Sequence, residues 1–212
     1  VFFVNYAECD INMNEYPRRM RPDIYKDVYC EDGDSFFRES KFLFGLVSSL
    51  IIKKEKWDKR VKKYTGSGFI HVGAIAEILA NDAAFIISEK LVNLRTPVTG
   101  KERWHNAGYW EIVRPGLELV KIFNCMKELG YSERTCLYLI DNIFRANLRL
   151  ILVLNMMEAR DRKQIARAMI SCYGRYPTFW LIHLPFLFTP IAVFRLLRKI
   201  RKTFKKLLGG IR

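Results

Sequence analysis

The chain has few residues that could bind a transition metal, and those few are scattered. It contains three histidines and five cysteines in 212 residues. No two cysteines have the spacing of a zinc site, and the histidines are too dispersed to form an evident metal set. The odd number and wide separation of the cysteines predict reduced, mostly buried thiols in a cytoplasmic protein. The residues concerned are His71, His105, His183, Cys9, Cys30, Cys125, Cys136 and Cys172.

Acidic residues are also in short supply. Lysine and arginine number 36 against 22 aspartates and glutamates, which gives a net charge of +14. Half of the residues are apolar, enough to bury a substantial core in one domain with an appendage. A charge of this size favours a polyanionic partner, either nucleic acid or an anionic membrane, and the placement of the charges must decide between the two.

Residues 44–73 are the one stretch with the pattern of a site. An apolar run over 44–53, rich in β-branched residues, predicts a buried strand. Ser48 and Ser49 interrupt this run. Since a buried hydroxyl needs a hydrogen-bond partner, they either bond neighbouring backbone or reach a cleft. Residues 53–63 then contain seven lysines and arginines against two acidic residues.

A helix is expected after the glycine pair Gly66 and Gly68. Ser67 between them is a good N-cap residue and predicts a helix that continues through Leu79. His71 then lies in the first turn, where the helix dipole keeps a histidine neutral and free backbone N–H groups suit phosphate. The alternative is a histidine that only fills the junction between strand and helix.

The order of these features resembles one family of enzymes. Over residues 1–115 the chain looks like bacterial family 2 glycosyltransferases of the abequosyltransferase-like kind. The resemblance implies an α/β, helix-rich chain: the C-terminal part of a nucleotide-diphospho-sugar transferase (GT-A type) fold, followed by a mainly α-helical region. Such enzymes transfer a sugar from a nucleotide-sugar donor to a glycan or lipid-linked acceptor in surface polysaccharide synthesis. The matching features are the SSLI sequence at 48–51, the lysines that lead to Trp57, the Y-x-G-x-x-F-x-H pattern at 64–71, and Leu94, Arg95 and Trp104.

The resemblance also implies that a nucleotide-binding half precedes this chain. In the family, a D-x-D motif in that half holds a divalent metal, Mg or Mn, so the main metal ligands are expected outside this chain. The apolar strand expected at 1–5 would follow that motif. Asp32-Gly33-Asp34 also has the D-x-D pattern and could bind a hard cation. Because it lies in a polar segment before the SSLI strand, a solvated loop is favoured there.

The same resemblance places the acceptor side of a sugar-transfer site in this chain. An acceptor hydroxyl needs a general base. No acid lies inside the SSLI strand, so His71 is the first candidate, ahead of Glu39 and Asp34. Ser48 and Ser49 are expected to line the acceptor cleft. Lys53 and Lys54 are expected to contact phosphate, although a solvated helix face explains most of the lysines equally well. Trp57 or Trp104 is expected to stack against a sugar face. Arg95, Trp104 and His105 are expected on a loop over the site.

Helices are expected to dominate from Pro115 onward. Pro115 suits a first helical turn and Gly130 a C′ position, and Ser132 can cap the next helix. The sequence therefore divides into an acceptor-side region at 1–114, a helical region at 115–174 and a tail at 175–212. Before Pro115, the expected strands are at 1–5, 44–53, 83–88 and 91–94. The buried face of the helix after Ser132 is expected to contain Leu137, Ile140, Phe144, Ile151 and Leu154.

Residues 176–194 carry no formal charge and are nearly long enough to cross a bilayer of about 30 Å. Three prolines within them remove backbone hydrogen bonds, so a broken, interfacial or re-entrant segment fits better than a single span. Burial against the protein's own core is the alternative. The aromatic residues that suit the headgroup level are Phe179, Trp180 and Phe188.

A basic amphipathic helix is expected over 193–212. Apolar residues recur every three or four positions from Val193 to Ile211, and the residues among and after them include eight basic and no acidic ones. Such a stripe lies flat on anionic lipid, where each basic residue contributes about 1 kcal/mol. It favours a peripheral protein on the cytoplasmic face of the plasma membrane over nucleic-acid binding, which uses basic residues interleaved with polar and exposed aromatic ones. A non-catalytic, membrane-associated scaffold is the alternative to an enzyme.

Overall fold

The computed structural model describes residues 1–10, 12–15, 24–41, 43–95, 109–155, 162–190, 192–193 and 196, with the backbone alone for 109–113, 147–155 and 162. The chain forms two compact units. Unit 1 comprises Val1–Asn106 and Glu118–Ile143, and unit 2 comprises Ala107–Leu117 and Phe144–Arg212. Each unit therefore combines two separate stretches of the sequence.

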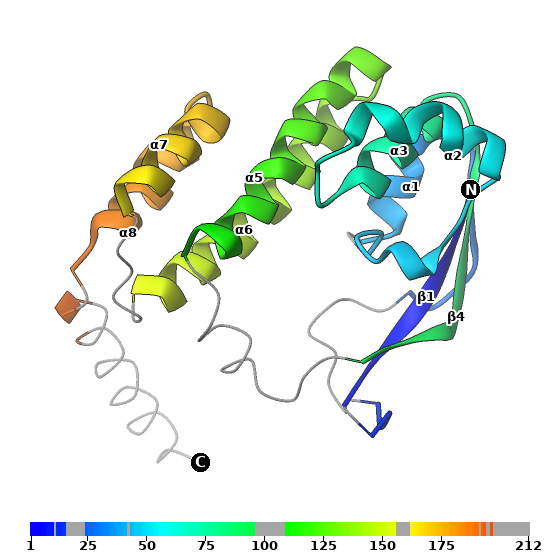
Figure 1. Cartoon of the computed structure of the whole chain (residues 1–212), viewed down its shortest axis with the longest axis horizontal. Coiled ribbons are helices and arrows are strands. Elements are labelled where there is room, and N and C mark those ends of the chain that lie inside the picture. Colours follow the sequence, from blue (N-terminus) through cyan, green and yellow to red (C-terminus); the bar gives the residue numbers. More distant parts are fainter. Residues whose placement is uncertain are drawn as a thin grey trace, which may run out of the picture. The chain divides into compact units, whose positions relative to one another are not determined.

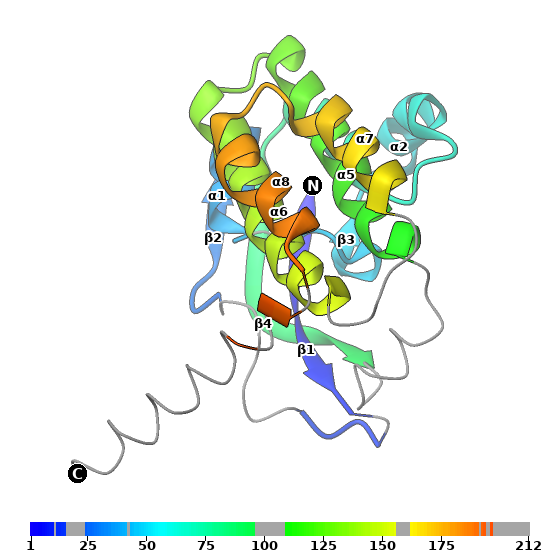
Figure 2. The same cartoon turned by 90° about the vertical axis from the view of Figure 1, so that its left-hand side faces the viewer.

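Unit 1 contains a four-stranded mixed sheet in the order β2-β4-β1-β3. β1 (Phe2–Cys9) and β4 (Ala84–Arg95) are parallel and lie side by side (Figure 1). β2 (Val28–Cys30) is antiparallel to β4, and β3 (Leu50–Ile51) is antiparallel to β1 (Figure 2). The strand predicted at 1–5 is confirmed, and the runs predicted at 83–88 and 91–94 form one continuous strand.

The buried strand predicted over 44–53 is wrong for most of that range. Val47–Ser49 form a 3-10 helix, η1, and only Leu50–Ile51 pair with β1. Val47 and Ile51 are both exposed. The apolar run supplies a short edge strand instead of a core strand, and a β-branched composition does not distinguish the two.

The helices in the first stretch of unit 1 lie near the end of the sheet where β1 starts (Figure 1). They are α1 (Gly33–Glu39), α2 (Lys54–Arg60), the 3-10 helix η2 (Val61–Tyr64) and α3 (Ile70–Leu79). Buried aromatic rings pack α1 against the segment before η1 and against Tyr131, and that segment against Phe123. The ring centroid of Phe37 is 4.9 Å from that of Phe44 and 5.6 Å from that of Tyr131, and Phe44 is 6.5 Å from Phe123.

Two long helices contain the region around Pro115 to Asn155. Pro115 lies inside α5 (Tyr109–Cys125) instead of in its first turn, so that prediction is wrong. The 3-10 helix η3 (Met126–Leu129) follows and ends at Gly130, whose φ of 92° confirms the predicted C′ role. Ser132 caps α6 (Glu133–Asn155) as predicted, because its Oγ accepts a hydrogen bond from the Thr135 backbone nitrogen at 3.3 Å.

The predicted buried face of α6 is correct at Ile140 and Phe144, which are both buried. It is wrong at Leu137, which is 45% exposed, and the buried positions near it are Leu139 and Ile143. With 3.6 residues per turn, positions 137 and 140 are only about 60° apart on the helix, so the exposure of a residue at the border of the apolar stripe depends on what packs against the helix. The side chains of Ile151 and Leu154 lie outside the described residues.

Unit 2 contains α7 (Arg162–Tyr173), the π-helix η4 (Phe179–His183) and α8 (Leu184–Phe188). Its core contains Phe144 and Tyr173, whose ring centroids are 4.6 Å apart, together with Phe179 and Leu187. The uncharged segment at 176–194 is broken, as predicted, because α8 ends at Phe188. Among the described residues, no helix has the length and apolar character needed to span a membrane.

Candidate functional site

His71 lies in the first turn of α3, as predicted, and its side chain is buried. Its Nε2 atom is 3.0 Å from the carbonyl oxygen of Gly45. A carbonyl can only accept, so Nε2 carries the hydrogen and donates it, and Nδ1 keeps the ring's lone pair. Burial lowers the pKa of His71, although the bond to Gly45 opposes this effect. The imidazole is therefore neutral at pH 7, with its basic atom at Nδ1.

The start of α3 is held by a residue that sequence reasoning missed. Ser67 was predicted to be the N-cap, but this prediction is wrong, because Phe69 occupies that position. The carboxylate of Glu118 instead accepts hydrogen bonds from the Gly68 nitrogen at 3.0 Å and the Ser67 hydroxyl at 3.3 Å. One of the amides expected to suit phosphate is thus already paired. Glu118 is 50 residues away in the sequence, and no local motif indicates the contact.

The two serines of the SSLI sequence have different environments. Ser49 is buried, and its hydroxyl donates to the Leu46 carbonyl at 2.6 Å, so neighbouring backbone satisfies it. Ser48 is exposed. Both residues follow Gly45 closely, and the Gly45 carbonyl holds His71. The hydrogen bond thus holds the histidine against the loop just before the SSLI sequence.

The basic segment after β3 forms α2 and η2. Lys53 and Lys54 are exposed and line a shallow surface depression with Glu55 and Asp58. Lys54 forms an exposed ion pair with Asp58 one helical turn later. Such a pair contributes little to stability, so the depression is a polar surface that presents lysines to solvent. Trp57 is half-buried on the same helix.

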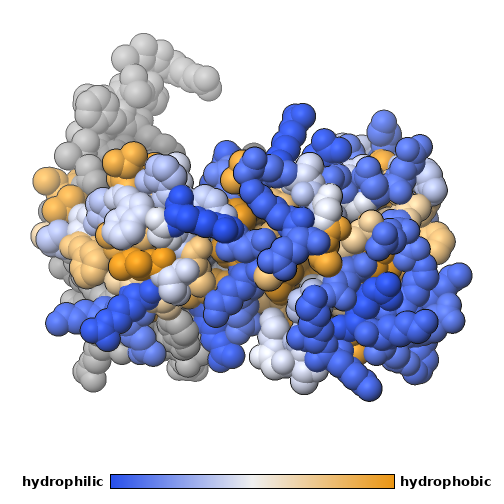
Figure 3. Space-filling view, turned by 90° about the horizontal axis from the view of Figure 1, so that it is seen from above, coloured by the Kyte–Doolittle hydropathy of each residue, from blue (hydrophilic) through white to orange (hydrophobic). Residues whose placement is uncertain are grey.

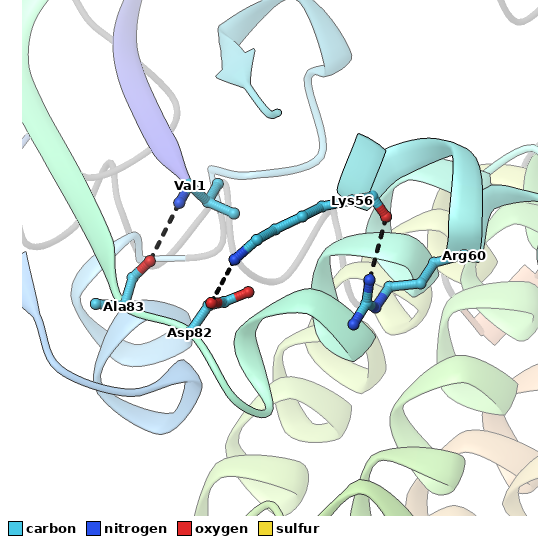
Figure 4. A network of polar contacts seen from close by, with 5 residues as sticks. All are labelled: Val1, Lys56, Arg60, Asp82 and Ala83. Carbon is cyan, nitrogen blue, oxygen red and sulfur yellow. Dashed lines mark hydrogen bonds and ion pairs between the residues drawn. The ribbon is translucent and has the colours of Figure 1, made fainter. Parts of the chain in front are cut away.

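Lys56, in the first turn of α2, is bound to the loop just before β4 (Figure 4). Lys56 Nζ is 2.5 Å from Asp82 Oδ1, and the Arg60 side chain donates to the Lys56 carbonyl at 3.3 Å. The nitrogen of Val1 donates to the Ala83 carbonyl at 3.1 Å beside them. Lys56 therefore has a structural partner, whereas Lys53 and Lys54 lie at the exposed end of the helix.

Tyr64 and Glu77 connect η2 to α3. The Tyr64 hydroxyl donates to Glu77 Oε1 at 3.0 Å, and Lys63 forms an ion pair with the same carboxylate. Burial, and then the neighbouring Glu77, raise the pKa of Tyr64 above its usual range. Burial opposes ionisation of Glu77, but the hydrogen bonds from Lys63 and Tyr64 outweigh it and lower the pKa of that carboxyl. The ring of Tyr64 lies directly against Gly73.

Asp32 and Asp34 of the D-x-D sequence accept structural hydrogen bonds, and Glu39 lies on the surface. Asp32 is the N-cap of α1 and accepts from the Ser35 nitrogen at 2.7 Å, so the loop predicted there is wrong. Asp34 accepts from the Ser132 hydroxyl at 2.8 Å. Glu39 is exposed at the end of α1. The two aspartates have separate partners and do not fit a metal, and no group of metal-ligating side chains occurs in the described part of the chain.

Arg95 lies at the far end of the sheet from the SSLI segment. β3 pairs with Phe2 and Phe3 of β1, next to Phe85 of β4, whereas Arg95 ends β4 opposite Cys9. Ten residues of strand correspond to about 30 Å. Arg95 itself is therefore remote from the strand part of the SSLI sequence, and Trp104 and His105 lie outside the described residues.

The fold defines a mixed α/β, helix-rich protein, and the contacts around His71 define a buried neutral histidine at a helix start. Lys53 and Lys54 lie in an exposed polar depression that they share with Glu55 and Asp58. No family model matches the chain, and no curated protein or solved structure matches it either.

Four of the five cysteines are buried and Cys125 is exposed, and all five are free thiols, in agreement with the prediction.

Proposed function

We propose that this chain is the acceptor-side part of a glycosyltransferase that transfers a sugar from a nucleotide-sugar donor to a glycan or lipid-linked acceptor at the cytoplasmic face of the bacterial plasma membrane. The observation that carries the proposal is the hydrogen bond from His71 Nε2 to the Gly45 carbonyl. It joins the histidine of the Y-x-G-x-x-F-x-H pattern to the residue three positions before the SSLI sequence, within the block 44–73 on which the family resemblance is based, and it leaves Nδ1 as a base. The GT-A type of fold is part of the same proposal.

In this proposal His71 Nδ1 accepts the proton of the acceptor hydroxyl as its oxygen attacks the anomeric carbon of the donor. The bond from that carbon to the diphosphate breaks, and the nucleoside diphosphate leaves with both electrons. Lys53 and Lys54 are exposed and stabilise the negative charge that develops on the leaving group. A divalent metal, Mg or Mn, would supply further neutralisation of the diphosphate through ligands outside this chain.

The test is a donor-hydrolysis screen on the longer protein in which this chain is expected to be the C-terminal part. Slow release of the nucleoside diphosphate from one nucleotide sugar is expected, and it should accelerate when an acceptor glycan is added. The scaffold alternative predicts no release from any donor, and an upstream reading frame without a D-x-D sequence. Either of those two results would count against transfer chemistry.

A pH profile tests the role of His71 independently. Because burial lowers its pKa below the ordinary value of 6.5, the histidine stays neutral and competent as a base in mildly acidic solution. The acidic limb of kcat/KM, which reports the free enzyme, is therefore expected below pH 6.5. In the same range the unfolded chain binds more protons at this site than the folded chain, so stability should fall as the pH falls through 6.5. An acidic limb above 6.5 would assign the profile to another group.

A further inference from the structure

The segment formed by η4 and α8 has one anchored face and one exposed apolar face. Phe179, His183 and Leu187 recur every four residues, and all three are buried. Most of the side chains between them are exposed. Leu181 is 78% exposed and Trp180 46% exposed, and the exposed apolar residues of the segment are Trp180, Leu181, Ile182 and Phe188. Figure 3 shows hydrophobic surface on the left, where α7 and α8 lie.

The anchored face is held by polar as well as apolar contacts. His183 Nε2 is 3.0 Å from the Phe144 carbonyl oxygen, and Nδ1 is 3.3 Å from that of Thr178. The His183 ring also packs against the ring of Phe144, with the centroids 4.9 Å apart. A face fixed in this way presents its exposed side chains in one geometry, which lowers the entropic cost of binding.

The polar group of the Trp180 side chain is already hydrogen-bonded within the protein. Its indole Nε1 donates to the Gly174 carbonyl at 2.6 Å, so the single polar group of the side chain already has a partner. Moving an unpaired N–H into hydrocarbon is costly. The ring of Trp180 can therefore enter an apolar medium without that cost, and the neighbouring Leu181 and Ile182 carry no polar side-chain atom.

The stretch of sequence that carries this face has charges of one sign. Residues 162–212 contain twelve basic residues and not one aspartate or glutamate. Lys163, Arg167 and Arg175 are exposed in the described part of this stretch. Arg175 lies over the Tyr176 ring, 5.0 Å from its centroid, and donates to the Tyr176 hydroxyl at 2.8 Å. Basic residues near an anionic leaflet contribute about 1 kcal/mol each.

We propose that the exposed face of η4 and α8, formed by Trp180, Leu181, Ile182 and Phe188, inserts into the interfacial region of an anionic bilayer. This inference rests on the membrane association in the proposed function and not on the sugar transfer. A bilayer fits the combination of bulky aliphatic and aromatic side chains with surrounding positive charge. Nucleic acid does not, since Leu181 and Ile182 offer neither a stacking ring nor a hydrogen bond to a base.

Vesicle flotation tests the proposal with the whole chain. The wild-type chain is expected to float with vesicles of phosphatidylglycerol and phosphatidylcholine and to remain unbound with phosphatidylcholine alone. Leu181→Asp should weaken the partition into the mixed vesicles by at least about tenfold, because it places a carboxylate where the proposal inserts a leucine side chain into the bilayer. Leu91→Asp is the matched control, since Leu91 is 59% exposed in β4 of unit 1 and the change in charge is the same. The control should bind like the wild type.

The outcomes separate the proposals. If the wild type ignores both kinds of vesicle, the membrane association and the insertion both fail. If the wild type floats and Leu181→Asp floats equally well, the insertion fails while association through 193–212 stands. Salt-sensitive RNA binding without flotation would replace the membrane by nucleic acid as the partner.

A fluorescent label gives a second readout that does not depend on affinity. An environment-sensitive dye on Leu181→Cys, in a Cys125→Ser background because the other cysteines are buried, should shift its emission to the blue when anionic vesicles are added. A dye that is already shielded without vesicles, and becomes exposed after truncation at residue 190, would show that the chain's own tail occupies this face. That result would overturn the proposal.

Discussion

Replacing His71 by glutamine is expected to lower the turnover of the full-length enzyme by at least about a hundredfold, which is the usual contribution of a general base. The glutamine amide nitrogen can take the place of Nε2 and continue to donate to the Gly45 carbonyl. It offers no basic atom at the position of Nδ1. His71→Gln therefore keeps the connection between α3 and the loop before η1 and removes only the base. Single-turnover rates with saturating donor and acceptor measure the effect.

The alanine variant separates chemistry from positioning. His71→Ala removes the hydrogen bond to Gly45 together with the base, and it should also lower turnover by at least about a hundredfold if His71 is the base. If glutamine restores the rate that alanine loses, His71 positions the loop and another group takes the proton. If both variants turn over like the wild type, His71 does not belong to the site.

Gly73→Ala is expected to destabilise unit 1 by about 1–3 kcal/mol, the range for overpacking a tight contact. A Cβ atom at this position would lie less than 3.0 Å from three carbon atoms of the Tyr64 ring. The ring cannot move aside freely, because its hydroxyl is bonded to Glu77 on the same helix, α3. The midpoint and slope of urea unfolding measure the change, and a two-state fit gives the free energy of unfolding.

Gly45→Ala is the matched control for this prediction. No atom lies within 4 Å of a Cβ built on Gly45, and its φ is not in the left-handed region, so alanine there should be neutral or slightly stabilising. Tyr64→Ala should remove most of the penalty of Gly73→Ala in the double variant, because the ring is the obstacle. Equal destabilisation by Gly73→Ala with and without the ring would contradict the packing described for α3.

Sequence reasoning worked where the signal is local. The N-cap at Ser132, the left-handed glycine at Gly130 and the first-turn position of His71 each depend on a few neighbouring residues. The break in the uncharged segment at 176–194 follows from its prolines in the same way. The mixed α/β class also follows, because short apolar runs precede Pro115 and helical patterns dominate after it.

The errors arise where a distant partner decides the structure. The run at 44–53 has the composition of a core strand, but only two residues pair with β1, and the three before them form a 3-10 helix. Ser67 is a good cap by composition, yet Glu118 holds the loop before α3. For the site, the sequence indicated His71 and the serines but not the Gly45 carbonyl that connects them. A backbone carbonyl has no signature in the sequence.

The parallel pairing of β1 with β4 has a consequence for synthesis of the protein. Phe2 pairs with Phe85, so two residues that face each other in the sheet are 83 positions apart in the sequence. At a translation rate of about 5–20 residues per second, β1 is made roughly 4–16 s before its partner. During that time the apolar side chains of β1, including Phe3 and Tyr6, lack the sheet that buries them in the folded protein. The nascent chain therefore has a long interval in which chaperones compete with aggregation, and slower translation lengthens it.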